Sequence, residues 1–126
     1  MSLKPVITGA GLGLRRSFIN DLSASFPDSI NFMEVAPENW IDVGGRFAVA
    51  LEKATSQAPL VCHGLSLNLG GLAPIDEAFV HRVKHFLETF HVAHYSEHLS
   101  YCGDEGHLYD LMPIPFTTEA VRHVVD

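Results

Sequence analysis

Short apolar segments of this chain end in histidine and glutamate, residue types that bind metal ions and transfer protons. Leu60–Cys62 runs directly into His63, and Val92–Tyr95 runs through a serine into Glu97 and His98. A buried strand gains nothing from such an end, because an unpaired polar group removed from water costs several kcal/mol. Neutral imidazole is the commonest metal ligand among side chains. The pattern therefore favours a sheet whose strand ends gather a metal or acid–base site at one edge.

Side-chain alternation separates the candidate residues at the end of Val92–His98. Successive side chains of a strand point to opposite faces, so Glu97 and His98 cannot share a face. His98 has the parity of Ser96 and His94. One interpretation makes His98 a metal ligand, and His94 is then more consistent with filling the interior. Glu97 would then point sideways, where a carboxylate can orient a ligand. The alternative is a His–Glu pair that only closes the edge of the core.

A second group of polar residues lies in and after the apolar segment Ile30–Val35. Glu34 is part of this segment, and Glu38 and Asn39 follow it. One interpretation is a general base, a substrate contact or a group that supports a metal ligand. The other is a loop stabilised by Asn39, with a carboxylate that accepts backbone N–H groups. The residues alone favour neither interpretation.

Other candidate motifs have simpler structural explanations. Gly9–Leu14 lacks the third glycine of a dinucleotide-binding loop. His81 and His85 are spaced i, i+4 but lack the HExxH pattern, and a solvated helix face explains them. Cys62 neighbours His63 and should point the other way, toward the helices, which disfavours a catalytic Cys–His pair. Cys102 lies in a glycine-rich segment and is a weak nucleophile candidate.

The chain alternates between strand-like and helix-like segments. The predicted strands are Val6–Leu14, Ile30–Val35, Leu60–Leu67 and Val92–His98. The predicted helices are Ser17–Phe26, Phe47–Ala54, Asp76–Phe90 and one that begins near Glu119, capped by Thr117 or Thr118. Ser100–Pro115 contains two glycines and two prolines, and we expect a long connection there. Alternation with short connections predicts a parallel sheet with helical crossovers.

The predicted fold class is α/β, with about four βα units. These are half of a TIM (β/α)8 barrel, which typically needs about 250 residues. We therefore expect residues 1–126 to be the N-terminal half of a TIM-barrel-like domain, and a last helix that reaches Asp126 without a stop signal agrees with this. The alternative architecture is a small open parallel sheet. Exposed sheet edges predict that the half-barrel forms a homo-oligomer.

The bulk composition excludes several classes of protein. Hydrophobic residues make up 47% of the 126 residues and charged residues 18%, which is typical of a globular domain. A formal net charge of −7 argues against nucleic-acid binding. No apolar stretch approaches the ~20 residues of a membrane span, and the N-terminus lacks a signal peptide. Two cysteines are too few for a disulfide framework, so we expect a cytoplasmic protein without membrane contact.

Five sequence blocks occur in order along most of the chain: Gly11–Arg15, Phe32–Trp40, Cys62–Leu67, Ser96–Ser100 and Asp110–Pro115. Together they resemble the multinuclear non-haem iron-dependent oxidative enzymes, a family long catalogued as of unknown function. The resemblance implies a TIM barrel of about twice this length that carries two or three iron ions. It also implies oxygen-dependent modification of a peptide substrate, often at cysteine, and a small partner protein that presents the peptide.

The resemblance also implies roles for individual residues. It places the early histidine ligands at His63 and His98, with Glu34 and Glu97 as supporting catalytic groups. The positions that would contact substrate or support the ligands are Glu38, Asn39, Ser66 and Asp110. The remaining ligands of the family come from later strands, which these 126 residues do not contain. We therefore expect weak iron binding and no activity from this chain alone.

Two rival functions remain open from the sequence. Similar-looking metal TIM barrels catalyse isomerase or phosphoesterase chemistry with divalent ions, and turnover without oxygen would favour that class. The third hypothesis is a non-catalytic half-barrel that associates with itself. A sharply monomeric species that is stable to dilution would argue against self-association.

Overall fold

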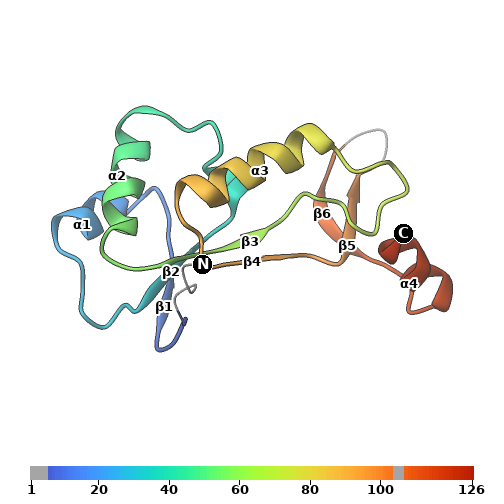
Figure 1. The fold of residues 1–126 in the computed structure, drawn as a ribbon, viewed down its shortest axis with the longest axis horizontal. Coiled ribbons are helices and arrows are strands. Elements are labelled where there is room, and N and C mark those ends of the chain that lie inside the picture. Colours follow the sequence, from blue (N-terminus) through green and yellow to red (C-terminus); the bar gives the residue numbers. More distant parts are fainter. Residues whose placement is uncertain (1–5, 104–106) are drawn as a thin grey trace.

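Four parallel strands form the central sheet, in the order in which the chain makes them (Figure 1). The strands are β1 (Gly11–Gly13), β2 (Phe32–Val35), β3 (Leu60–Gly64) and β4 (His94–Glu97). The computed structural model describes residues 6–103 and 107–126. Because every neighbouring pair is parallel, the carboxyl ends of all four strands meet at one edge of the sheet. The predicted α/β class and parallel sheet are confirmed, and closure into a barrel stays a prediction.

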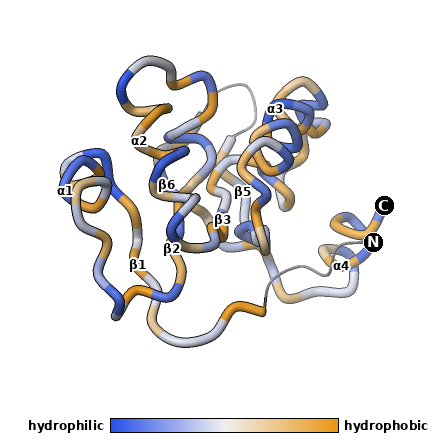
Figure 2. The backbone as a smooth tube through the Cα atoms, turned by 60° about the vertical axis from the view of Figure 1, so that its left-hand side comes forward, coloured by the Kyte–Doolittle hydropathy of each residue, from blue (hydrophilic) through white to orange (hydrophobic). Residues whose placement is uncertain are grey.

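The crossover helices cover one face of this sheet (Figure 1). They are α1 (Ile19–Ala24), α2 (Gly45–Thr55) and α3 (Glu77–Thr89), and a single 3₁₀ turn, η1 (Pro37–Asn39), follows β2. Hydrophobic and hydrophilic residues alternate along α3, as Figure 2 shows. Asp76 caps the start of α3, and its carboxylate accepts a hydrogen bond from Phe79 N at 3.0 Å. Its apolar stripe buries Val83 and Phe86.

The core lies between these helices and the covered face of the sheet. Alternation along each strand sends every second side chain into it. Its largest fully buried residues are Ile19, Met33, Leu51, Leu60, Pro37 and Cys62. Cys62 is 1% exposed and belongs to this cluster, so its predicted orientation toward the helices is confirmed.

The other face of the sheet is partly or fully exposed in the described structure. The residues on it, placed by strand alternation and register, are Phe32, Glu34, Val61, His63, His94 and Ser96. All-parallel sheets occur almost only with both faces covered. His63 and His94 lie on this uncovered face, opposite the face that the helices cover.

An antiparallel hairpin occupies the segment after β4. Its strands are β5 (Ser100–Gly103) and β6 (His107–Pro113). The prediction of a long connection over Ser100–Pro115 was therefore wrong. Its glycines are typical of loops, but Gly103 is the last residue of β5, and Gly106 lies outside the described residues. Ser100 and Cys102 are buried and Tyr101 between them is exposed, an alternation typical of a strand.

The loop after β3 ties the hairpin to the sheet. The Asn68 side chain accepts a hydrogen bond from Cys102 N at 2.7 Å and donates one to the carbonyl of Gly103 at 2.8 Å. The backbone N–H of Gly70 donates to the carbonyl of Ser100 at 2.8 Å. The Asn68 amide thus replaces a neighbouring strand for β5. This fixes the hairpin at the carboxyl edge of the sheet.

The last helix, α4 (Thr118–Val125), begins where the sequence predicts it. The Thr117 hydroxyl accepts a hydrogen bond from Ala120 N at 3.2 Å, which confirms the predicted cap. No residue of α4 is buried. Among the described residues, no helix is long and apolar enough to cross a membrane.

Candidate metal-binding site

Two histidines meet at the carboxyl edge of the sheet. His63 is the second-last residue of β3, and His98 follows directly after β4. Parallel pairing aligns His63 with Ser96, which brings His98 within reach across the two strands. The two Nε2 atoms are 3.3 Å apart, and the ring centroids are 4.3 Å apart. Two of the predicted metal ligands, His63 and His98, are thus in direct side-chain contact.

The second nitrogen of each ring is held by the protein. Nδ1 of His98 lies 2.9 Å from the carbonyl oxygen of Gly64. A carbonyl oxygen only accepts, so His98 carries its proton on Nδ1 and its Nε2 presents a lone pair. Nδ1 of His63 lies 2.8 Å from the Ser96 hydroxyl, which can accept the same kind of N–H donation. Both Nε2 atoms are then free to act as ligands.

The spacing of the two Nε2 atoms fits a shared metal ion. Metal–imidazole bonds are about 2.0–2.1 Å long, and two such bonds at a near-tetrahedral angle separate the nitrogens by about 3.3 Å. The observed separation is 3.3 Å. Without a metal, a proton on one Nε2 atom can form a hydrogen bond between the two rings, and a metal ion would take the place of that proton. The donor set is imidazole, which suits iron, zinc and copper.

Glu97 occupies the other face of β4, as strand parity predicts. Its side chain is only 6% exposed. It accepts hydrogen bonds from the Tyr95 hydroxyl at 2.9 Å and from His98 N at 2.8 Å. Burial and the hydrogen bond to Glu97 raise the pKa of the Tyr95 hydroxyl above its ordinary value. Glu97 therefore anchors the backbone that carries His98.

Room for this anchor comes from Gly64, the partner of Glu97 in the parallel ladder. A Cβ atom at Gly64 would overlap both the Glu97 carboxylate and the Tyr95 hydroxyl. The sequence analysis identified neither Tyr95 nor this role of Gly64. The shared parity of Tyr95 and Glu97 was the signal that could have identified this pair.

Glu38 contacts the loop that follows His63. Its Oε1 atom accepts hydrogen bonds from the backbone N–H of Leu65 at 2.7 Å and of Ser66 at 2.9 Å. Within the described residues, its Oε2 atom is buried without a hydrogen-bond partner. Ser66 thus reaches Glu38 through its main chain. Of the two interpretations of Glu38, the structure shows a carboxylate that binds backbone N–H groups.

Among the described residues, no hydrogen bond or ion pair joins the remaining predicted site residues to the histidine pair. Glu34 is exposed on the open face of β2, and Asp110 is exposed on β6. Asn39 is exposed, and its carbonyl accepts a hydrogen bond from Arg16, whose guanidinium stacks over Trp40 at 5.6 Å. In residues 6–103 and 107–126, no group of three or more His, Cys, Asp or Glu residues is placed to hold a metal ion. The described part of the site is the histidine pair.

Neither cysteine has the environment of a nucleophile. Cys62 and Cys102 are buried. Burial, followed by the negative charges of Glu38 and Glu34, raises the pKa of the Cys62 thiol to about 12. Burial likewise raises the pKa of Cys102. Since the thiolate is the reactive form, the structure does not support Cys102 as a nucleophile.

The Cys62 thiol predicts a loss of stability in alkaline solution. In the unfolded chain the thiol ionises near its ordinary pKa of 9.0, whereas the folded chain holds the proton to about 12. Between these values the unfolded state loses a proton that the native state keeps, so the free energy of unfolding falls as pH rises, by up to about 1.4 kcal/mol per unit. Urea unfolding at pH 8, 9 and 10 measures this slope. Cys62→Ala should flatten it, and an equally steep slope in that variant would contradict the assignment.

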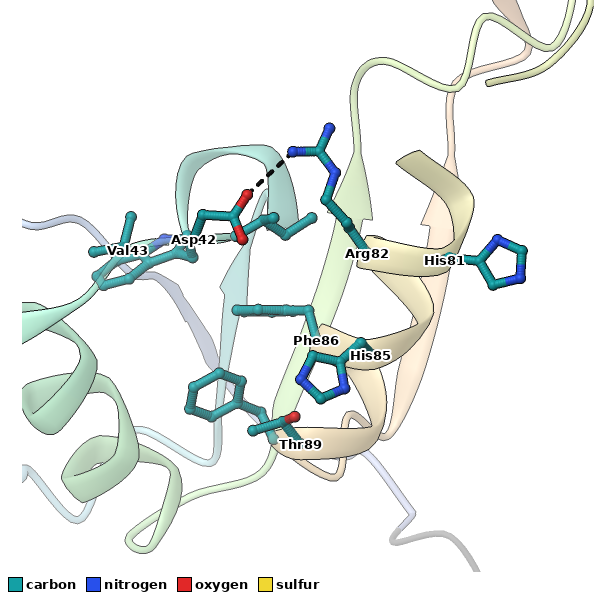
Figure 3. Close-up of a pocket in the computed structure, with 10 residues that line it drawn as sticks. Asp42, Val43, His81, Arg82, His85, Phe86 and Thr89 are labelled. Carbon is teal, nitrogen blue, oxygen red and sulfur yellow. Dashed lines mark hydrogen bonds and ion pairs between the residues drawn. The ribbon is translucent and has the colours of Figure 1, made fainter. Parts of the chain in front are cut away.

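A separate cavity lies on the helix layer (Figure 3). It has a volume of about 470 Å³ and lies between α3 and the segment around η1, and an Arg82–Asp42 ion pair of 3.1 Å crosses it. Both partners are largely exposed, so the pair contributes little to stability. His81 and His85 are exposed, and Figure 3 shows His81 pointing away from the cavity. This confirms the predicted solvated helix face.

The described residues thus form an α/β protein with a histidine pair at the carboxyl edge of parallel strands. Residues 9–126 match the family model described as "RiPP precursor modification enzyme MbnB/TglH/ChrH". The chain belongs to this family. The resemblance inferred from the five sequence blocks is therefore confirmed.

Curated relatives share about half of the residues over most of this chain. A UPF0276 protein of Shewanella sediminis is 54% identical over 115 residues, which are 91% of this chain and 41% of the relative. One of Nitrosospira multiformis is 52% identical over 122 residues, or 97% of this chain and 43% of the relative. One of Pseudomonas aeruginosa is 51% identical over 120 residues, or 95% and 42%. The chain spans about two fifths of the length of these relatives.

Proposed function

We propose that this chain is the N-terminal part of an iron-dependent oxidative enzyme that modifies a peptide. One observation carries the proposal: the Nε2 atoms of His63 and His98 face each other at 3.3 Å while both Nδ1 atoms are held by the protein. The family description supports a peptide as the substrate class. A small partner protein that presents the peptide is part of the same proposal.

In this proposal His63 and His98 hold the metal through Nε2. Iron, when bound, supplies the electron transfer to oxygen that the side chains cannot perform. The protein's own contribution is orientation: Gly64 and Ser96 fix the imidazole rings, and the buried Glu97 fixes the main chain of His98. Glu34, on the open face of β2, would meet the substrate or further ligands from that side.

A complete (β/α)8 barrel is the proposed architecture. The four strands follow one another in sequence order and are all parallel, as the first half of such a barrel requires. The face that would become the barrel interior is uncovered and carries both histidines. The relatives are more than twice as long as the matched region, which leaves room for four more βα units and further ligands. Alone, we expect the half-barrel to bind iron weakly and to form homo-oligomers through its exposed edges.

The test uses a protein of the full family length that contains this chain. Purified without oxygen, it should contain iron, measured by elemental analysis and by optical and Mössbauer spectra. With its peptide substrate it should consume oxygen and change the peptide mass. A protein that holds only zinc and consumes no oxygen would contradict the proposal. Turnover without oxygen would instead favour a divalent-metal isomerase or phosphoesterase, which the imidazole pair also suits.

A further inference from the structure

The Glu38 carboxylate joins the ends of two neighbouring strands. Glu38 lies in η1, directly after β2, and its Oε1 accepts the N–H groups of Leu65 and Ser66, directly after β3. Hydrogen bonds to a charged acceptor are shorter and about twice as strong as neutral ones. The observed lengths of 2.7 and 2.9 Å fit that class. The path of the chain after His63 is thus fixed by a side chain from another strand.

The contact with Leu65 also determines the direction of the Gly64 carbonyl. The N–H of Leu65 and the C=O of Gly64 belong to one peptide group, which is planar and trans. When Glu38 fixes the N–H, the carbonyl must therefore point the opposite way. It points at His98 Nδ1, 2.9 Å away. One rigid peptide group connects Glu38 to the ring of His98.

The charge on Glu38 strengthens this connection. An N–H that donates to a carboxylate polarises its own peptide group, which makes the carbonyl oxygen a better acceptor. A stronger acceptor favours the form of His98 that is protonated on Nδ1 and has a lone pair on Nε2. That lone pair faces His63.

We propose that Glu38 is a positioning residue that sets the tautomer and ring orientation of His98 through the Gly64–Leu65 peptide. The inference rests on the proposed function, because it gives His98 the role of a ligand. A purely structural Glu38 would stabilise the loop and leave the His98 ring unchanged. The two roles therefore differ in what they do to one imidazole.

The experiment reads the His98 ring directly in the metal-free 126-residue chain. Imidazole ¹⁵N spectra at pH 8 distinguish the Nδ1–H form from the Nε2–H form. We expect Nδ1–H for His98 in the wild type and a shift toward Nε2–H in Glu38→Ala. Glu38→Gln keeps an acceptor oxygen for the two N–H groups and should restore the Nδ1–H form. If Glu38→Ala fails to fold, Glu38→Asp, one methylene shorter, replaces it with the same expected shift.

Asp76→Ala is the matched control. Asp76 is also a carboxylate that accepts a backbone N–H, at the start of α3, so its loss destabilises the chain without touching the strand ends. It should leave the His98 spectrum unchanged. An unchanged spectrum in Glu38→Ala, or in Glu38→Asp where that variant replaces it, would overturn the inference.

Iron affinity separates this inference from the proposed function. In the full-length protein, Glu38→Ala should weaken iron binding about 10–100-fold, as loss of a ligand-orienting group does, and Glu38→Gln should recover most of it. A shifted spectrum in a protein that never binds iron would refute the proposed function and leave the positioning role intact. Normal iron binding with an unshifted His98 would refute the positioning role alone.

Discussion

Iron binding by the full-length protein should fall by more than about 100-fold when His98 is replaced by alanine. Loss of a group that merely orients a ligand costs about 10–100-fold, and loss of a ligand atom should exceed that. His63→Ala should have a similar effect, because the two Nε2 atoms are placed at 3.3 Å to share one ion. Anaerobic iron titration measures the affinity. Activity on the peptide should be lost in parallel.

His94→Ala is the control for both histidine variants. His94 lies on β4, on the same open face, and is exposed. Its replacement tests whether any imidazole on this face supports iron binding. We expect iron content within about twofold of wild type, because neither of the facing Nε2 atoms is removed. Full iron content in His98→Ala with a normal circular dichroism spectrum would show that the histidine pair is not the site.

The separation of Glu97 from His98 was predictable because it follows from a single rule. Strand residues alternate, so two adjacent side chains cannot reach one site, and the structure places Glu97 at 6% exposure on the helix side. The positions of His63 and His98 followed from the ends of two apolar runs. Parallel strands that end in polar residues must gather them at one edge. These parts of the site depend on local pattern and strand direction only.

The distinction between Glu34 and Glu38 was not predictable from the sequence. Both are glutamates, four residues apart, at the end of the same strand. What separates them is the loop after β3. Its backbone N–H groups donate to Glu38, whereas Glu34 stays exposed on the open face of the sheet. That contact joins residues 27 and 28 positions apart. No periodicity within either segment encodes it.

The hairpin was missed for a related reason. Its glycines and prolines are typical of loops, and the strand character of β5 comes from two partners, β6 and the Asn68 amide. An asparagine side chain that replaces a strand leaves no pattern in the sequence. Long-range pairing therefore overrode the local signals over Ser100–Pro115.

Gly64→Ala should lower the free energy of unfolding of the 126-residue chain by about 3 kcal/mol. The added Cβ would overlap the Glu97 carboxylate and the Tyr95 hydroxyl, which are hydrogen-bonded to each other at 2.9 Å. Overpacking costs about 1–3 kcal/mol, and a buried carboxylate that loses a donor adds about 1–3 kcal/mol. Urea unfolding followed by circular dichroism measures the change. Gly13→Ala on β1 is the matched control, because its added Cβ would meet no atom within 4 Å among the described residues beyond its chain neighbours, and we expect a change within about 0.5 kcal/mol.

A double-mutant cycle locates the source of this cost. If the overlap with Glu97 causes it, Gly64→Ala should be much less harmful in a Glu97→Ala background, where the carboxylate is gone. Glu97→Ala alone should be destabilising, because the Tyr95 hydroxyl and the N–H of His98 both lose their acceptor. Equal costs of Gly64→Ala in the two backgrounds would contradict the overlap. A coupling of 1 kcal/mol or more, within the usual range of roughly 0.5–3 kcal/mol for residues in contact, would show that the glycine at the end of β3 is required by the buried carboxylate that supports His98.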